Sequence, residues 1–186
     1  MNKLESRGKT AIRRRTLSAP VKWLLDNRRL QGFVLDYGCG LGQDVDILNG
    51  SHCFNTVHGW DPVHKPDIEP SLYNTVYCNY VLNVLDSTFE MAEVINNCLA
   101  KLLGPNDFAY FAVRNRIPDL RGPTSKGTYQ CHVRNIKALK KLYSNGSFII
   151  YRGRSVDVCL SGDIDAVVYP TGRREEFKGV PHTTVD

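Results

Sequence analysis

The sequence lacks any long hydrophobic run, and no window approaches the roughly 20 apolar residues that a membrane-spanning helix needs. Its first residues are polar and basic and carry no apolar segment of the kind found in secretory signals. Six cysteines are scattered along the chain without a C-x-x-C pair, which argues against a disulfide framework. We therefore expect a protein of a reducing compartment, with a cytoplasmic location and no membrane association.

Zinc-ligand spacing is also missing. Three histidines and a cysteine lie close together but match no zinc motif, so we expect no metal site at this cluster: His52, Cys53, His58 and His64. The 186 residues are 42% hydrophobic and 23% charged, which indicates a globular chain with a core of its own. We expect a single domain over residues 1–186, in which residues 1–9 and about 170–186 are extended or flexible.

The stretch that organises the chain lies between residues 33 and 44. A short apolar run predicts a buried strand that ends at Asp36, and three glycines then alternate with other residues before a helical pattern begins. Strand, glycine turn and helix form the first unit of a doubly wound α/β domain, whose ligands bind at the carboxyl ends of the strands. The dinucleotide fingerprint G-x-G-x-x-G fits in neither register, because Gln43 and Val45 break its spacing.

The pattern Asp-x-Gly-x-Gly-x-Gly that starts at Asp36 resembles motif I of the class I S-adenosylmethionine-dependent methyltransferases. In that family the glycine turn packs against the methionine part of the cofactor, and an acidic residue after the next strand holds the ribose hydroxyls. Asp61 stands where that residue belongs. The resemblance implies S-adenosylmethionine as the cofactor, with these residues as its binding set: Asp36, Tyr37, Gly38, Gly40, Gly42, Asp44, Trp60, Asp61, Pro62 and Asn79. A tight turn that binds no ligand is the alternative.

The rest of the chain is compatible with the same fold. Ser18 is a suitable N-cap for a helix with Pro20 in its first turn. Further elements are expected in this order: strands 56–60 and 73–78, a helix over 89–103, a strand over 107–113, a short basic helix over 135–143, and strands 147–152, 156–160 and 166–169. Asp86 or Ser87 can cap the helix over 89–103. With the resemblance, this order implies a doubly wound, Rossmann-like α/β fold with a mostly parallel seven-stranded sheet and a closing antiparallel hairpin.

Four segments together resemble a narrower family, the bacterial DNA phosphorothioation-associated methyltransferases. They are residues 10–20, 35–40, 59–62 and 80–84, and the similarity extends over roughly residues 9 to 113. This resemblance implies methyl transfer more strongly than it implies a DNA substrate. Because residues 10–20 belong to the shared pattern, we expect them to fold over the cofactor or substrate crevice.

The catalytic candidates are Asn79 and Tyr80, which end the strand that lies beside the cofactor's methyl group in this fold. Nucleobase amino methyltransferases carry Asp/Asn-Pro-Pro-Tyr at this place, whereas the run here is Asn-Tyr-Val-Leu. No cysteine follows a proline, so the usual nucleophile of a C5-cytosine enzyme is missing as well. Helix capping and turn chemistry would account for Asn79 and Asn83 equally well.

Two groups of arginines precede and follow the glycine turn, and the chain has a formal net charge of +5. We expect a nucleic acid, DNA or RNA, as the substrate, bound through these side chains: Arg13, Arg14, Arg15, Arg114, Arg116 and Arg121. For any single arginine, a solvated surface position is the simpler interpretation. A non-catalytic S-adenosylmethionine sensor, a methyltransferase for a small molecule or protein, and a nucleotide-dependent oxidoreductase stay open, the last disfavoured by the glycine spacing.

Overall fold

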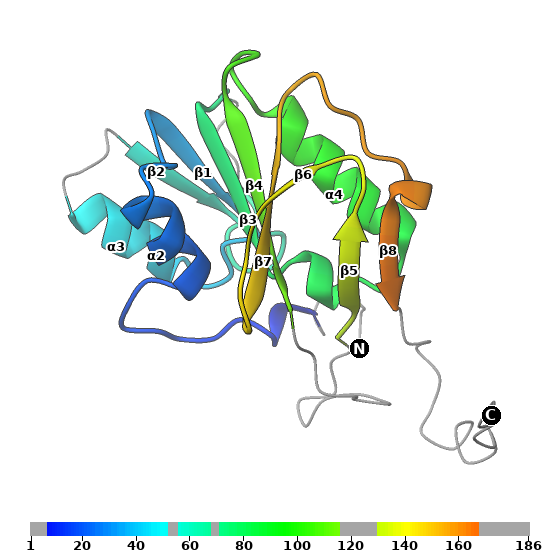
Figure 1. Cartoon of the computed structure of the whole chain (residues 1–186). Coiled ribbons are helices and arrows are strands. Elements are labelled where there is room, and N and C mark those ends of the chain that lie inside the picture. Colours follow the sequence, from blue (N-terminus) through cyan, green and yellow to red (C-terminus); the bar gives the residue numbers. More distant parts are fainter. Residues whose placement is uncertain (1–6, 52–55, 68–70, 116–129, 168–186) are drawn as a thin grey trace, which may run out of the picture.

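The computed structural model describes residues 7–51, 56–67, 71–115 and 130–167. A six-stranded sheet with the order β2-β1-β3-β4-β7-β6 forms its centre, and β5 pairs with β8 in a separate sheet (Figure 1). The strands are β1 (Phe33–Tyr37), β2 (Thr56–Trp60), β3 (Thr75–Asn79), β4 (Phe108–Arg114), β5 (His132–Ile136), β6 (Lys140–Ser144), β7 (Phe148–Gly153) and β8 (Ile164–Val167). The helices are α2 (Ala19–Asp26), α3 (Gln43–Gly50) and α4 (Thr88–Ala100), with 3-10 turns η1 (Leu82–Val84) and η2 (Ser161–Asp163).

Strands β2, β1, β3 and β4 are parallel, and β7 and β6 close the sheet in antiparallel orientation. This is the expected mostly parallel α/β sheet with an antiparallel hairpin at its end. Strands β3 and β4 are buried along almost their whole length, as is typical of strands covered on both faces. The carboxyl ends of β1, β2 and β3 therefore open at one edge of the sheet, where a ligand site is expected.

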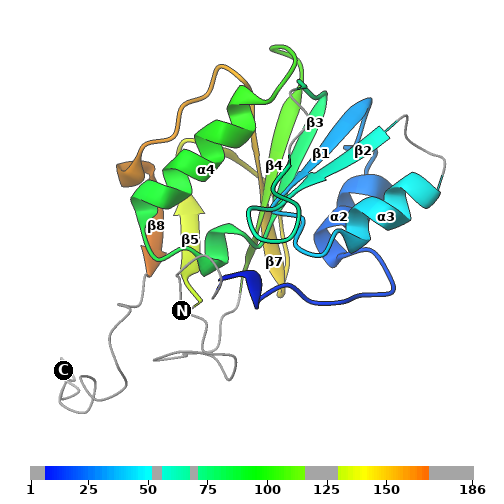
Figure 2. The same ribbon diagram turned by 180° about the vertical axis from the view of Figure 1, so that it is seen from behind.

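Two layers cover the two faces of the sheet. Helices α2 and α3 lie on one face, and α4 lies on the other together with the β5–β8 pair, as opposite views show (Figures 1 and 2). Each face has its own apolar core: Val21 and Leu24 of α2 belong to the first, and Met91 and Ile95 of α4 belong to the second. Burying both faces of the central strands in this way contributes most of the stability of such a fold.

Local signals at the helix starts agree with the sequence. Ser18 is the N-cap of α2 and a proline stands in the first turn, although the Ser18 side chain makes no capping bond. The Ser87 side chain caps α4 by accepting a hydrogen bond of 3.2 Å from the Phe89 amide. The Ser87 cap helps to fix where α4 begins, because the first amides of a helix have no partner within it.

The main sheet has six strands within the described residues, so the expectation of seven is wrong. After β2 the chain turns back at once, since Asp61 forms a bridge with Lys65 and the Trp60 indole nitrogen donates to the Pro66 carbonyl at 3.0 Å. Prolines 62 and 66 cannot donate to a strand ladder, which favours this turn over a further strand. Strand β2 is consequently an edge of the sheet.

Two elements toward the end of the chain also differ from expectation. Residues 135–143, expected as a helix, form the end of β5, a turn and most of β6, because Lys140 and Tyr143 pair with β7 across the sheet. Residues 156–160, expected as a strand, have no ladder partner. The Asn96 side chain holds them instead through two hydrogen bonds of 2.9 Å to the Cys159 backbone. Pairing with distant segments overrides local preference at both places.

None of the helices in the described part of the chain is long and apolar enough to cross a membrane. The described residues also contain no group of three histidine, cysteine or acidic side chains placed to hold a metal ion. The five cysteines within these ranges are free thiols.

Candidate functional site

The glycine turn joins β1 to α3 and is tied to the end of β2. The amides of Gly38 and Cys39 both donate to the Trp60 carbonyl, at 2.7 and 2.9 Å. Gly38 has a φ of 83°, and a Cβ at this position would lie 2.3 Å from a methyl group of Val81. Glycine is needed here both for the left-handed backbone and for the close approach of the segment that follows β3.

Asp61 lies across this turn and its carboxylate is already engaged. One oxygen accepts from the Gly40 amide at 3.1 Å, and the other accepts from the amides of Val63 and His64 at 3.0 and 2.9 Å. A carboxylate offers about four acceptor positions, so one remains for a ligand hydroxyl, and the Gly40 bond can be exchanged for a second. This geometry fits a ribose diol held at the end of β2.

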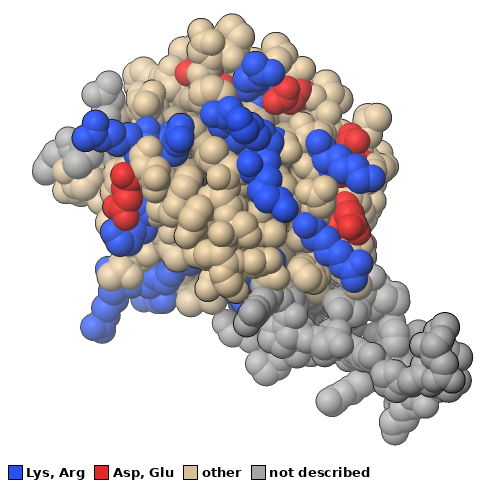
Figure 3. Space-filling view, viewed as in Figure 1, with Lys and Arg blue, Asp and Glu red and all other residues tan. Residues whose placement is uncertain are grey.

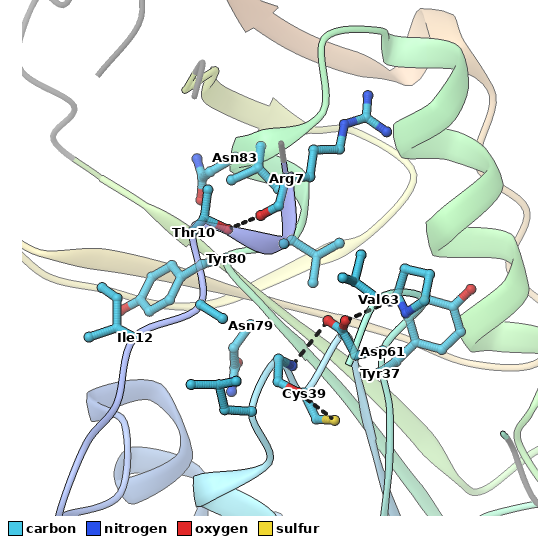
Figure 4. A pocket seen from close by; sticks show the side chains of 18 of the residues that line it. Arg7, Thr10, Ile12, Tyr37, Cys39, Asp61, Val63, Asn79, Tyr80 and Asn83 are labelled. Carbon is cyan, nitrogen blue, oxygen red and sulfur yellow. Dashed lines mark hydrogen bonds between the residues drawn. The ribbon is translucent and has the colours of Figure 1, made fainter. Parts of the chain in front are cut away.

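A cavity of about 480 Å³ opens at this edge of the sheet (Figure 4). Its size is within the range of small-molecule and cofactor sites. The walls come from the glycine turn, the segments that follow β2 and β3, the end of β4, helix α4 and the N-terminal residues. Of the residues expected at the site, the cavity is lined by Tyr37, Gly38, Gly40, Trp60, Asp61, Pro62, Asn79, Tyr80, Arg14 and Arg114.

Asn79 ends β3 beside this cavity with its side-chain amide unused. Both the amide nitrogen and the amide oxygen are buried, and neither has a hydrogen-bond partner among the described residues. Figure 4 shows the side chain between Cys39 and Tyr80. An unpaired buried amide costs free energy, so such a group in a cavity wall indicates a ligand that supplies the missing partners.

Tyr80, next in the chain, has a left-handed backbone with a φ of 63°. A bulky residue adopts this conformation at a cost of about 1–3 kcal/mol, and such strain is concentrated at functional sites. The Tyr80 amide donates to the Ala112 carbonyl at 2.8 Å, which holds the turn in place. Burial raises the pKa of the Tyr80 hydroxyl, although the charges of Arg114 and Arg14 oppose that rise.

Asp36 does not line the cavity. It is buried at the end of β1 with 4% of its surface exposed. Burial, and after it the negative charge of Asp44, raise the pKa of the Asp36 carboxyl well above its usual value. Asp36 therefore lies beneath the glycine turn. Tyr37, by contrast, reaches the cavity and packs against Trp60 with ring centroids 4.5 Å apart.

The N-terminal residues 7–18, here called the strap, run beneath this edge of the sheet and close the cavity (Figure 1). Thr10, Ala11 and Ile12 are in the cavity wall, and a Cβ on Gly40 would lie 3.1 Å from the Cβ of Ala11. The expectation that residues 10–20 fold over the crevice is confirmed for this part of the segment. The strap thus becomes one wall of the site.

Contacts at both ends fasten the strap. At one end, Arg7 forms ion pairs with Asp86 at 3.0 Å and Glu90 at 2.6 Å. At the other end, Asp44 accepts a hydrogen bond of 2.8 Å from the Ser18 amide and faces Arg14 at 3.6 Å. Asp44, expected among the cofactor residues, is outside the cavity and holds the strap. Gly42 is also outside the cavity wall, next to the Lys65 side chain.

The structure separates the arginines that the sequence groups together. Arg14 and Arg114 line the cavity, whereas Arg13 and Arg15 are exposed outside it. The positions of Arg116 and Arg121 lie outside the described residues. Figure 3 shows Lys and Arg side chains along the lower left edge of the molecule, where Figure 1 draws the strap.

Sequence reasoning missed Arg7 and the long-range hydrogen bonds of Asn83. Arg7 falls in a stretch expected to be frayed, and its partners are 79 and 83 residues away, so no local pattern announces it. Asn83 is 1% exposed; its side chain accepts from the Arg114 amide and donates to the Cys131 carbonyl, both at 2.9 Å. Asn83 therefore has a structural role, but through residues 31 and 48 positions away and not through the local capping or turn chemistry that the sequence suggested, and Asn79 does not share it.

No protein-family model matches the chain, and no curated protein matches it. Among solved structures it is similar to the magnesium protoporphyrin IX methyltransferase (ChlM) of Synechocystis PCC 6803 with bound S-adenosylhomocysteine, at 15% identity and a TM-score of 0.43, over 76% of this chain and 81% of that one.

A second similar structure is an S-adenosylmethionine-dependent methyltransferase of Clostridium acetobutylicum, at 10% identity and a TM-score of 0.43, over 80% of this chain and 68% of that one. A third, from work on the conversion of a disulfide bond into a thioacetal group in echinomycin biosynthesis, has 12% identity and a TM-score of 0.49, over 76% and 84% of the two chains. Structural similarity at these identities and TM-scores does not assign a function, so the functional proposal rests on the residues of the cavity.

Proposed function

We propose that the protein is an S-adenosylmethionine-dependent methyltransferase. The observation that carries the proposal is the unpaired, buried amide of Asn79 in a cavity that the glycine turn and Asp61 also border. Asp61 would hold the ribose hydroxyls, the turn at Gly38 and Gly40 would lie along the methionine part, and Asn79 would face the reacting end. When bound, S-adenosylmethionine supplies a methyl group on a positively charged sulfur.

The chain's own contribution is to exclude water and to align the acceptor with the methyl group. An acceptor that the cavity aligned with the methyl group would take it directly from the sulfonium, and any proton on that acceptor would leave to bulk solvent, since Asn79 cannot act as a base. Burial raises the pKa of the Cys39 thiol to about 12 and also raises that of the Tyr80 hydroxyl, so both stay protonated at neutral pH. An acceptor that is already nucleophilic suits this cavity.

We further propose that the methyl acceptor is a nucleic acid. Arg13 and Arg15 are exposed on the strap beside the cavity, and the formal net charge of +5 favours an anionic partner. The sequence resemblance to the DNA phosphorothioation-associated methyltransferases supports the same choice. We also propose a cytoplasmic location, because the free thiols are compatible with a reducing compartment.

Calorimetry with S-adenosylmethionine and with NAD tests the cofactor. We expect binding of the first and none of the second, and Asp61→Ala should weaken it by about 1.5–3 kcal/mol, the range for hydrogen bonds to a charged group. Asp26→Ala is the matched control, because Asp26 is an exposed carboxylate whose one ion-pair partner in the described part of the chain is Lys22. Equal affinity of the Asp61 variant and the control would remove Asp61 from the site.

Filter binding at several salt concentrations tests the nucleic-acid acceptor. Affinity for duplex DNA should fall with a slope near −0.9 per phosphate contacted, and the double variant Arg13→Ala, Arg15→Ala should flatten the slope by up to about two contacts. A protein that transfers methyl groups but shows no nucleic-acid affinity at low salt would act on a small molecule or a protein. Binding of S-adenosylmethionine without any methyl transfer would favour the sensor.

A further inference from the structure

Within the described ranges three arginines line the cavity, and their partners distinguish them. Arg7 is neutralised by two carboxylates, those of Asp86 and Glu90, so its charge is used to fasten the strap. Arg14 has a single, long ion pair of 3.6 Å with Asp44 and keeps 37% of its side chain exposed. Arg114 has no ion pair with any other described residue. Two guanidinium groups at the cavity therefore keep charge available for a ligand.

Both arginines line the same cavity as Tyr80. The guanidinium carbon of Arg114 lies 5.5 Å from the centre of the Tyr80 ring. Arg14 reaches the cavity from the strap and Arg114 from the end of β4. Burial is the largest influence on the Tyr80 hydroxyl and raises its pKa, although the positive charges of Arg114 and Arg14 oppose that rise. Tyr80 is consequently a neutral hydrogen-bond donor in a cavity wall that also carries these two cations.

The position of Tyr80 and the two arginines in the same cavity wall as Asn79 points to a role in ligand binding. Tyr80 directly follows Asn79, and its strained backbone turns the ring away from Asn79 toward Ile12 of the strap (Figure 4). A strained backbone that other contacts hold in place is expected where a side chain must point in one direction. Guanidinium groups bind carboxylate and phosphate in a bidentate manner, and a phenol hydroxyl adds a third donor.

We propose that Arg14, Tyr80 and Arg114 form an anion-binding subsite in the wall of the cavity that holds a phosphate group of the acceptor. This inference rests on the proposed methyl transfer and narrows its substrate to phosphate-bearing acceptors. Asp44 acts through Arg14 and is a positioning residue, because it holds both Arg14 and the strap backbone at Ser18. The phosphate belongs either to a nucleic-acid backbone or to a small phosphorylated molecule, and the two sources share the same recognition.

The test uses the full chain saturated with S-adenosylhomocysteine, with inorganic phosphate as the probe at constant ionic strength. Phosphate should raise the melting temperature of the wild-type protein, since a ligand that binds only the folded state stabilises it. Arg14→Gln and Arg114→Gln should each weaken phosphate binding at least tenfold. Arg114→Lys should retain part of it, because charge remains while the bidentate fork is lost. Lys140→Gln is the control, since Lys140 is exposed on β6 at the end of the β6–β7 hairpin that lies away from its turn and does not line the cavity.

Phosphate stabilisation that is equal in the wild type, the Arg114→Gln variant and the Lys140→Gln variant overturns the subsite. S-adenosylhomocysteine affinity, measured separately in the absence of phosphate, reports on the proposed function. A wild-type chain that does not bind it refutes the cofactor assignment, whatever phosphate does. A short oligothymidine then distinguishes the sources: its affinity falls in Arg114→Gln if the phosphate belongs to a nucleic acid. If phosphate binds and the oligonucleotide does not, the acceptor is a small phosphorylated molecule.

Discussion

Two asparagines at opposite ends of β3 have opposite environments. Asn74, just before the strand, accepts a hydrogen bond from the Phe33 amide and donates to Asp107, both at 3.1 Å. Asn79, its last residue, has no partner for either amide atom among the described residues. The same contrast separates the two ends of the sheet. At the amino end the Asn74 side chain is bonded through both amide atoms, whereas the carboxyl end combines an unpaired amide, a strained tyrosine and available positive charge.

This difference shows which end of the sheet is committed to stability and which to a ligand. A polar group whose bonds are satisfied within the fold stabilises it, while one left unpaired is a cost that a ligand can remove. Gln31 and Thr75 continue the pattern at the amino end, because the Thr75 hydroxyl bonds both the amide and the carbonyl of Gln31 at 3.0 Å. Substitutions at the two ends should therefore affect different measurements.

The largest expected effect is at the carboxyl end, in Gly40→Val. A β-branched side chain at a φ of 55° is strained, and its Cβ would press on Ala11 and lift the strap. We expect S-adenosylhomocysteine affinity to fall more than 100-fold in calorimetry. Circular dichroism should still show a folded chain, because Gly40 belongs to neither apolar core. An affinity within threefold of wild type would contradict the placement of the cofactor along this turn.

At the amino end, Asn74→Ala should lower the free energy of unfolding by about 2 kcal/mol, since two hydrogen bonds are lost and the Phe33 amide loses its side-chain partner. Urea denaturation measures this loss. S-adenosylhomocysteine affinity should stay unchanged in the same variant. An Asn74→Ala variant with normal stability and weakened affinity would show that the amino end of β3 serves the ligand, contrary to the comparison of the two ends.

The buried carboxyl of Asp36, near the carboxyl end of β1, should make the free energy of unfolding depend on pH. Its pKa is raised in the folded protein, so its favourable contribution is present below the unfolded value near 4 and is lost as pH rises toward the folded value. Relative to Asp36→Asn, the wild type should therefore lose stability with rising pH above about 4, by up to about 1.4 kcal/mol per pH unit. Urea denaturation of both proteins across this range measures the difference. Parallel curves would show that Asp36 titrates normally.

The smallest effect on stability is expected for Asn79→Ala, the counterpart of Asn74→Ala. Removing an amide that has no partner should change the free energy of unfolding by less than about 0.5 kcal/mol, or raise it. S-adenosylhomocysteine affinity should fall about three- to tenfold, the equivalent of one hydrogen bond. A loss of stability as large as that of Asn74→Ala would show that the amide is bonded in solution.

The sequence was a good guide wherever the signal is local. The strand–turn–helix unit around Gly38 and the α4 cap at Ser87 depend on neighbouring residues, and both appear as expected. Strand β6 depends on pairing with β7, so its basic, helix-compatible sequence was misleading. Of the seven expected strands, residues 156–160 form none, and the strand expected at 166–169 overlaps β8, which pairs with β5 outside the main sheet.

The candidate site shows the same limit. Sequence assigns Asp44 to the cofactor because it follows the glycine turn, yet Asp44 points to partners in the strap, 26 and 30 residues earlier in the chain. Asn79 and Asn83 are equivalent by pattern, and only the fold shows that one is bonded on both sides and the other on neither. Contacts between distant segments decide these roles, and no single stretch of sequence encodes them.

The bonds of Asn83 have a consequence for how the two sheets are joined. By holding both the Arg114 amide and the Cys131 carbonyl, this side chain ties the end of β4 to the residue that precedes β5. One buried amide thus joins the central sheet to the smaller β5–β8 sheet. Its loss should loosen the attachment of the smaller sheet without removing any hydrogen bond of either strand ladder.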